Sequence, residues 1–182
     1  VYVHTPRLAG WSTPFLPVTL AVTDSVGVRA PTRDVAVDAD GTFAAEMTDA
    51  AGAPRTLMPG DAVAFATADE TALVAVEDLN FDFDVQSGLI AIAPPSRDLV
   101  VTLTLRGGQI LEFPGRTDGQ RVFRYGPADV PLRSAWTLAL VADIRIAMPN
   151  ARGDEIVAVG SVAQDPGSAR AGTWLPFVVR TR

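Results

Sequence analysis

The residues of this chain that are able to do chemistry are few and far apart. His4 is the only histidine among the 182 residues, and the sequence contains no cysteine. A Ser-His-Asp site requires a histidine held beside a nucleophile and an orienting acid. Zinc requires more ligands than one histidine when cysteine is absent. We therefore expect a surface or packing role for His4, and we predict neither a nucleophilic site nor a zinc site.

Asp38, Asp40 and Gly41 have the composition of the start of a calcium-binding loop. An EF-hand loop continues with further ligands at set spacings and ends with a bidentate Glu at its twelfth position. Phe43 and Ala45 stand in the region where those ligands are required. We therefore predict a hairpin turn here, in which Gly41 adopts a positive φ without a Cβ clash.

Asp82 and Asp84 alternate with two phenylalanines and therefore project from the opposite face of a predicted strand. With Glu77 or Asp78 they offer carboxylate ligands for calcium at the seam between two modules. A solvated strand face accounts for the same alternation. We therefore predict no metal site and no cofactor.

The other residue types give no catalytic centre. Glycoside hydrolysis requires two carboxyl groups that face each other across a cleft, and the sequence pairs none of its 21 acids in this way. The glycines fall at predicted turns and form no phosphate-binding motif. We therefore predict that the chain is not an enzyme. Exposed tryptophans would favour sugar binding, and Trp11 and Trp174 keep that alternative open, whereas Trp136 is in phase with neighbouring leucines and is expected in the core.

Composition limits the partners of the chain. Charged residues make up 20% of it, the net charge is −6, and all 15 basic residues are arginines scattered among the acids. Nucleic-acid binding requires a clustered basic face, so we predict no nucleic-acid partner. No apolar run approaches the ~20 residues that span a bilayer. The chain starts at Val1 without a Met, and we expect either a removed leader or a part of a longer protein.

The elements that must position these residues follow a plan that occurs twice. Pro14 belongs to a proline corner that runs into an alternating strand at Val18–Thr23. Pro95 belongs to a second proline corner, which runs into the alternating strand Leu99–Leu105. The two corners, like the two strands, are 81 positions apart. The chain therefore contains one β-module written twice.

The whole chain is predicted to consist of short strands with a turn about every ten residues, which is typical of antiparallel sandwiches. No stretch shows a sustained helical period with caps. In the second copy we expect segment 136–140 to correspond to segment 62–66, and Gly119 to correspond to Gly41. The predicted strands are 1–4, 8–11, 18–23, 33–38, 42–47, 62–66, 71–76, 79–85, 89–93, 99–105, 110–113, 123–125, 136–140, 144–148, 155–159 and 173–181.

We therefore predict an all-β fold of two tandem Ig-like antiparallel β-sandwich modules with an additional C-terminal strand. Module 1 spans residues 1–77 and module 2 spans residues 78–161. Residues 162–182 form a connector and the additional strand. The polar pair at the seam, Glu77-Asp78, leaves little slack, so we expect a stiff tandem.

Three motifs resemble the bacterial Ig-like, carboxypeptidase-regulatory-like repeats of large secreted or surface-attached proteins. They are Ala93-Pro94-Pro95 before an alternating strand, Asp38-Ala39-Asp40-Gly41-Thr42-Phe43, and Pro59-Gly60-Asp61-Ala62-Val63. The resemblance covers most of residues 8–160. It implies β-sandwiches that serve as stalks, spacers and adhesive or assembly modules at the cell surface, usually without a catalytic centre. Copy two departs from the pattern, because Leu132-Arg133-Ser134-Ala135 stands where copy one has Pro59-Gly60-Asp61.

The two copies are unequal at their first strand. Copy two has the segment Leu79–Val85, whereas copy one offers about four residues from Val1. An incomplete sandwich leaves an open edge that another strand must cover. The candidate is Thr173–Thr181, in which Pro176 favours an edge or first strand and the partner-strand residues in phase are Leu175, Phe177 and Val179. Pairing within one chain closes the fold, whereas pairing between chains is a heterologous contact that propagates into a fibre.

These patterns together predict a non-catalytic, extracellular structural or assembly module of a cell-surface structure or filament. Its expected partners are other copies of itself or neighbouring surface-protein modules. The alternative is an adhesin or carbohydrate-binding β-sandwich, which would act through loops or exposed tryptophans. The sequence leaves both the partner and the route of strand pairing open.

Overall fold

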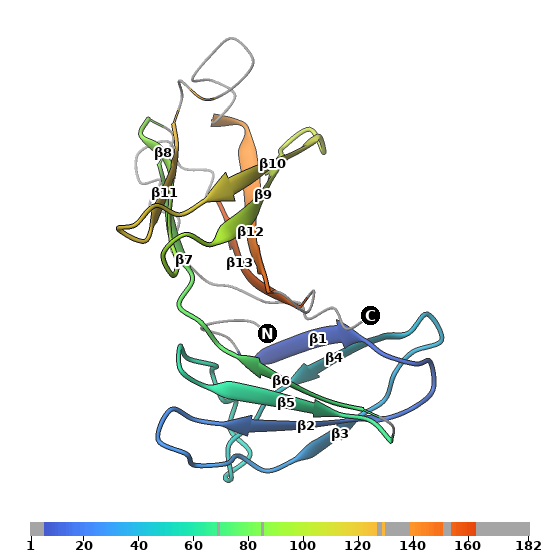
Figure 1. Ribbon diagram of the computed structural model, residues 1–182. Helices are drawn as coiled ribbons and strands as arrows, with labels where there is room; N and C mark the ends of the chain where they lie inside the picture. The colour runs from blue at the N-terminus through green and yellow to red at the C-terminus, as the bar shows by residue number, and fades with distance from the viewer. Residues whose placement is uncertain are drawn as a thin grey trace. The chain divides into compact units, whose positions relative to one another are not determined.

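Figure 1 shows the computed structural model of the chain. It describes residues 6–68, 70–84, 86–126, 129, 139–150 and 154–162. These residues build thirteen β-strands, and every pairing with a defined register is antiparallel. The predicted all-β class is therefore confirmed. No helix in this described part is long and apolar enough to cross a membrane.

The chain divides into two compact units between Asp78 and Leu79. The first unit also includes Pro149–Val157, and the second continues from Ala158. The predicted strands at 1–4 and 173–181 lie outside the described residues. Most of the connector predicted for 162–182 lies outside them as well.

The first unit contains a two-stranded sheet, β1-β4, and a four-stranded sheet, β3-β2-β5-β6 (Figure 1). Alternating apolar residues of both sheets are buried, among them Leu8, Leu20 and Val63 at 1% exposure or less. The rings of Phe43 and Phe65 meet in this core with centroids 6.3 Å apart. The strands are β1 Arg7–Trp11, β2 Val18–Thr23, β3 Arg33–Val35, β4 Thr42–Glu46, β5 Ala62–Ala66 and β6 Thr71–Ala75.

The second unit contains a three-stranded sheet, β11-β8-β7, and a four-stranded sheet, β10-β9-β12-β13, in which only the end of β12 and the start of β13 fall within the stretch Pro149–Val157 that is grouped with the first unit. Phe81 and Phe83 of β7 are buried, as the predicted alternation requires. Phe113 and Tyr125 stack with ring centroids 4.1 Å apart. The strands are β7 Asn80–Asp84, β8 Gly88–Ile92, β9 Asp98–Leu105, β10 Ile110–Arg116, β11 Val122–Tyr125, β12 Val141–Pro149 and β13 Glu155–Ser161.

The two four-stranded sheets share one strand order, with β2 in the place of β9 and β5 in the place of β12. Leu20 pairs with Phe65 in the first unit, and the residues 81 positions later, Val101 and Ile146, pair in the second. The proline corners match as well. Their non-glycine residues Phe15 and Ser96 both have positive φ, at 66° and 55°. The internal repeat predicted from the sequence is therefore present in the backbone.

One predicted correspondence is wrong. The strand that pairs with β9 as β5 pairs with β2 is β12, and not the segment 136–140. Residue Leu140 precedes β12 and is 37% exposed, while 131–138 lie outside the described residues. Period-2 alternation shows that a strand exists but does not fix its partner. The partner is fixed by burial of Ile144 and Ile146 against the β9 ladder.

A second predicted correspondence is also wrong. The position of Gly41 is taken in the second unit by Arg121, and not by Gly119. Both Gly41 and Arg121 have positive φ, at 84° and 69°, and both donate their backbone N–H to an aspartate carbonyl three residues earlier. The sequence matched Gly119 to Gly41 because both follow an aspartate-containing turn segment and glycine adopts a positive φ at the lowest cost. In the second unit it is Arg121 that adopts this conformation.

Strand β3 is shorter than predicted, since it ends at Val35 and not at Asp38. The carbonyl of Val37 accepts a hydrogen bond from the Phe15 N–H of the proline corner (3.3 Å), and the Asp38 N–H donates to Thr42 across the hairpin. The backbone beyond Val35 is therefore held by a corner and a turn. Val37 is nevertheless buried, which explains why the alternation continued in the sequence.

Candidate functional site

The sheets that contain β1 and β8 differ in their number of strands. In the second unit β8 lies between β11 and β7, whereas in the first unit β1 pairs with β4. Among the described residues, no strand occupies the side of β1 that corresponds to β7. We call this side the β1 edge, and define it as the backbone groups of Arg7 and Ala9, which face away from β4.

The hydrogen-bond pattern shows which backbone groups form the β1 edge. Ser12 N–H donates to Gly41 O (2.8 Å), and Met47 N–H donates to Pro6 O. Residues alternate in direction along an antiparallel strand, so Leu8 and Gly10 also face β4. The N–H and C=O of Ala9 therefore point away from β4, along the β1 edge. In the second unit Ile90 occupies this position and is paired with Asp82 of β7.

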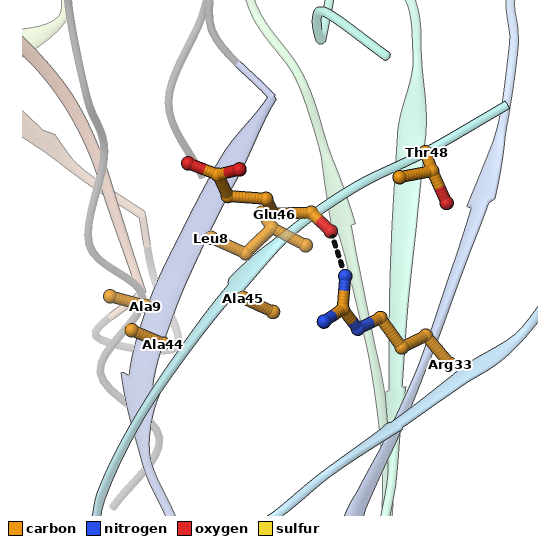
Figure 2. A pocket seen from close by; sticks show the side chains of 7 residues that line it. All are labelled: Leu8, Ala9, Arg33, Ala44, Ala45, Glu46 and Thr48. Atoms are coloured by element: carbon orange, nitrogen blue, oxygen red, sulfur yellow. Dashed lines mark hydrogen bonds between the residues drawn. The ribbon is translucent and has the colours of Figure 1, made fainter. Parts of the chain in front are cut away.

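The same sheet borders an open pocket of about 450 Å³ (Figure 2). Figure 2 shows the Arg33 side chain extending toward β4, where its Nη1 donates to the backbone carbonyl of Glu46 at 2.5 Å. This bond links β3, from the facing sheet, to β4. The pocket is lined by Leu8, Ala9, Arg33, Ala44, Ala45, Glu46 and Thr48.

The pocket lining is mostly small and aliphatic, and its one cationic side chain is Arg33. Its remaining polar residues are Glu46 and Thr48, and Figure 2 shows their side chains pointing apart. The arrangement is able to bind a small polar group. Sequence analysis missed this pocket, because Arg33 and β4 are brought together only by the sandwich.

The predicted turn at Asp38, Asp40 and Gly41 is confirmed. The Oδ1 of Asp40 accepts hydrogen bonds from the N–H and the hydroxyl of Thr42, at 2.9 and 2.7 Å. These two bonds, the hydroxyl bond foremost, lower the pKa of Asp40 from its ordinary value of 3.8. The carboxylate therefore stabilises the hairpin.

Asp84 has a similar role at the β7–β8 turn. Its Oδ1 accepts hydrogen bonds from the N–H of Ser87 (2.8 Å), the Ser87 hydroxyl (2.9 Å) and the N–H of Gln86 (2.9 Å). These bonds, led by the Ser87 N–H, hold the pKa of Asp84 below 3.8. Asp82 lies on the exposed face of β7. Within the described ranges, no group of three or more His, Cys, Asp or Glu is arranged to hold a metal ion.

The other predicted site residues are mostly outside the described part of the chain. His4, Trp136 and Trp174 lie there, as do the partner-strand residues Leu175, Phe177 and Val179. Trp11 is described, ends β1, and is 38% exposed. Of these residues, only Trp11 is in the described part of the chain, so the structure does not show how they lie relative to one another.

Two buried polar groups that the sequence did not single out also serve the backbone. Thr117 is 2% exposed; its hydroxyl donates to Pro94 O at 2.6 Å and accepts from Arg97 N–H at 2.9 Å. Asp61 is 4% exposed, accepts from Met58 N–H at 3.0 Å and lies 3.6 Å from Nη2 of Arg55. Both groups therefore stabilise turns.

No family model matches the chain, and no curated protein matches it. The chain is similar to a structure described as a tetra-tandem repeat in the extending region of a large adhesion protein. The sequences are 16% identical, the match covers 87% of this chain and 49% of that chain, and the TM-score is 0.28. The chain thus spans about half the length of that structure.

Proposed function

We propose that this chain is a non-catalytic structural module of an extracellular surface protein or filament, and that it assembles by β-strand donation between copies. The observation that carries the proposal is the unequal sheets of the two units. The sheet β11-β8-β7 has three strands, whereas β1-β4, built on the same plan, has two among the described residues. The β1 edge is therefore the place at which a further strand completes the repeat.

An unpaired strand edge is a template for another chain, because its N–H and C=O groups seek partners. Added strands recognise such an edge through main-chain hydrogen bonds and gain specificity from alternate side chains. A donor in one copy and an acceptor in the next form a heterologous contact, which extends into a linear assembly when the rotation does not close. An assembly role therefore follows from the same edge.

The non-catalytic part of the proposal is supported by the chemistry of the polar side chains. Asp40, Asp84 and Thr117 are engaged in turns, and the chain has one histidine and no cysteine. The extracellular part is supported by the resemblance of the proline-corner, Asp-Gly and Pro-Gly-Asp motifs to repeats of secreted and surface-attached proteins.

The test is the molar mass of the chain in light scattering over a range of concentrations. Strand donation predicts multimers that grow with concentration. A variant lacking Thr173–Arg182 should be monomeric while its far-UV circular dichroism still shows folded β-sheet. Phe177→Ser is the milder companion, since it keeps the chain length and removes one apolar anchor. A full chain that stays monomeric at the highest concentration would refute the assembly proposal.

A second candidate is binding of a carbohydrate, and the exposed Trp11 together with the neighbouring pocket favours it. Trp11 ends the strand that also supplies Leu8 and Ala9 to the pocket. A glycan array should then show a signal that Trp11→Ala removes and that Leu73→Ala, at an exposed position on β6, leaves intact. A blank array with the folded chain would exclude this candidate.

A further inference from the structure

An aromatic stack joins the end strands of the two sheets in the second unit. Phe113 of β10 lies opposite Val101, and Tyr125 of β11 lies opposite Leu89. Both β10 and β11 are the last strands of their sheets. The rings of Phe113 and Tyr125 stack with centroids 4.1 Å apart and an interplanar angle of 25°. The two rings therefore fill the space between the sheets at these end strands.

In the first unit Arg33 of β3 holds the place of Phe113. Arg33 lies opposite Leu20, and Leu20 precedes Val101 by the 81 positions of the repeat. Both β3 and β10 are end strands of a four-stranded sheet. Both side chains also reach the end strand of the facing sheet, since Arg33 donates to the Glu46 carbonyl of β4 (Figure 2). A guanidinium thus stands where the second unit has a phenyl ring.

In the same way Ala45 of β4 holds the place of Tyr125. Ala45 lies opposite Leu8. Tyr125 lies opposite Leu89, which follows Leu8 by 81 positions. Both Ala45 and Tyr125 are buried, but alanine lacks the phenol ring. Ala45 and Leu8 line the pocket of about 450 Å³, so this pocket lies at the place that a phenol ring fills in the second unit.

We propose that this pocket binds a phenolic ring, which takes the place of the Tyr125 ring and stacks against the guanidinium of Arg33. The aliphatic lining, which includes Leu8 and Ala44, gives the ring an apolar surface. A guanidinium is planar and stacks on aromatic faces, to which its charge is attracted by the ring quadrupole. The hydroxyl of Thr48, also in the lining, supplies a hydrogen-bond partner for the hydroxyl of the ring.

The pocket is prepared for such a ligand in its size and in the position of its cation. Its volume of about 450 Å³ falls in the range of about 300–1,000 Å³ that ligand pockets occupy, so it holds a ring with a substituent. The bond from Arg33 to the Glu46 carbonyl fixes the guanidinium before the ligand arrives, which reduces the freedom lost on binding. That bond uses one of the five N–H donors of the guanidinium.

This inference goes beyond the proposed assembly and does not depend on it. The pocket is built by side chains of the first unit alone, which spans Val1–Asp78 together with two later segments. A phenolic ring in it requires no second copy of the chain. A monomeric chain is therefore expected to bind the ring as well as an assembled one.

The test is a titration of the full, isotope-labelled chain with p-cresol, which is the tyrosine side chain as a free compound. Binding is followed by the amide shifts in heteronuclear NMR spectra. Cyclohexylmethanol is the matched probe of similar size without an aromatic ring, and a blocked tripeptide with a central tyrosine carries the same ring on a peptide. We expect p-cresol to shift the amides of Ala45, Glu46 and Thr48 saturably, with a Kd of about 1 mM, and cyclohexylmethanol to bind at least about threefold more weakly.

Three variants locate the binding. Ala45→Tyr supplies the missing ring from the chain itself and should abolish the shifts. Arg33→Gln removes the cation and should weaken p-cresol binding about three- to tenfold. Leu73→Ala, at an exposed position on β6, should leave it unchanged. If circular dichroism shows that Ala45→Tyr is unfolded, the double variant Arg33→Phe with Ala45→Tyr rebuilds the stack of the second unit and takes its place.

Absence of saturable shifts in the folded native chain at about ten times the expected Kd would overturn the proposal. Binding that persists unchanged in the folded variant with the ring in place would overturn it too, because the ligand would then lie elsewhere. Equal affinities for p-cresol and cyclohexylmethanol would overturn the assignment of a phenolic ring. Tighter binding of the tripeptide than of p-cresol supports a tyrosine side chain of a partner as the source of the ring, and weaker binding supports a free phenolic compound.

Discussion

Gly41 and Arg121 hold the same place in the two repeats, and replacing them is expected to have opposite effects. Gly41 has φ of 84°, and a Cβ added to it would lie 2.9 Å from the carbonyl oxygen of Ser12. The Gly41→Ala variant therefore meets both an unfavourable backbone conformation and a contact with main-chain atoms that cannot rotate away. Arg121 already carries a Cβ at φ of 69°, so Arg121→Gly removes backbone strain.

The expected loss of stability in Gly41→Ala follows from the backbone conformation and from the contact with Ser12 O. A non-glycine residue in the left-handed region costs about 1–2 kcal/mol, and the contact with Ser12 O adds to it. We therefore expect Gly41→Ala to lower the free energy of unfolding by about 2 kcal/mol. For a unit of this size, each kcal/mol shifts Tm by about 4–8 °C, which gives a decrease of about 8–16 °C. Arg121→Gly should raise stability by up to about 1 kcal/mol, less any loss of the 3.4 Å bond from its Nε to Ala93 O.

The assay is thermal unfolding followed by far-UV circular dichroism, with Gly119→Ala as the matched control. Gly119 forms the Asp-Gly pair in the second copy, but nothing lies within 4 Å of a Cβ added to it. Its substitution should stay within about 0.5 kcal/mol of the native chain. If Gly119→Ala is as damaging as Gly41→Ala, or Arg121→Gly is strongly destabilising, the structural alignment of the repeats is refuted.

Two further predictions concern the turns of the second unit. Thr117→Val keeps the shape of the side chain but leaves Pro94 O and Arg97 N–H without their hydroxyl partner. Urea unfolding should therefore show a free energy of unfolding that is lower by about 2 kcal/mol. The control Thr102→Val, on the half-buried face of β9, should change the free energy of unfolding by less than about 0.5 kcal/mol. An equal effect of the two would contradict the anchoring role of Thr117. The folded state lowers the pKa of Asp84 through the Ser87 hydrogen bonds, so its stabilisation is present above the unfolded pKa and is lost as pH falls through the folded pKa. Tm should therefore fall less in Asp84→Asn than in the native chain between about pH 5 and about pH 2, and identical pH profiles would show that the carboxylate does not support the turn.

Much of the strand pattern could be predicted from the sequence because burial alternates with period 2 along most strands. Val18–Thr23 and Ala62–Ala66 match the observed bounds of β2 and β5. The spacing of 81 positions was visible because the proline corners have conserved their geometry in both copies, down to the positive φ of Phe15 and Ser96. The local hydrophobic pattern was thus sufficient to predict the position of a strand wherever one face of that strand is buried and the other is exposed.

The candidate site was less accessible from the sequence. The β1 edge depends on which strands are neighbours in a sheet, and periodicity carries no information about neighbours. The bond from Arg33 to the Glu46 carbonyl joins residues of facing sheets, so no spacing along the chain predicts it. The correspondence between Gly41 and Arg121 was missed for another reason, since an arginine with positive φ has no signal in residue type.

Hydrogen exchange along β1 is the measurement that tests strand donation to the β1 edge most directly. In the native chain, the peptide spanning 7–11 should exchange faster at low protein concentration and become protected as the concentration rises, because the Ala9 amide gains a partner from another copy. The peptide spanning 88–92 is the internal control, since Ile90 is paired with β7 and should be protected at every concentration. Exchange of the 7–11 peptide that is independent of concentration would contradict strand donation to the β1 edge.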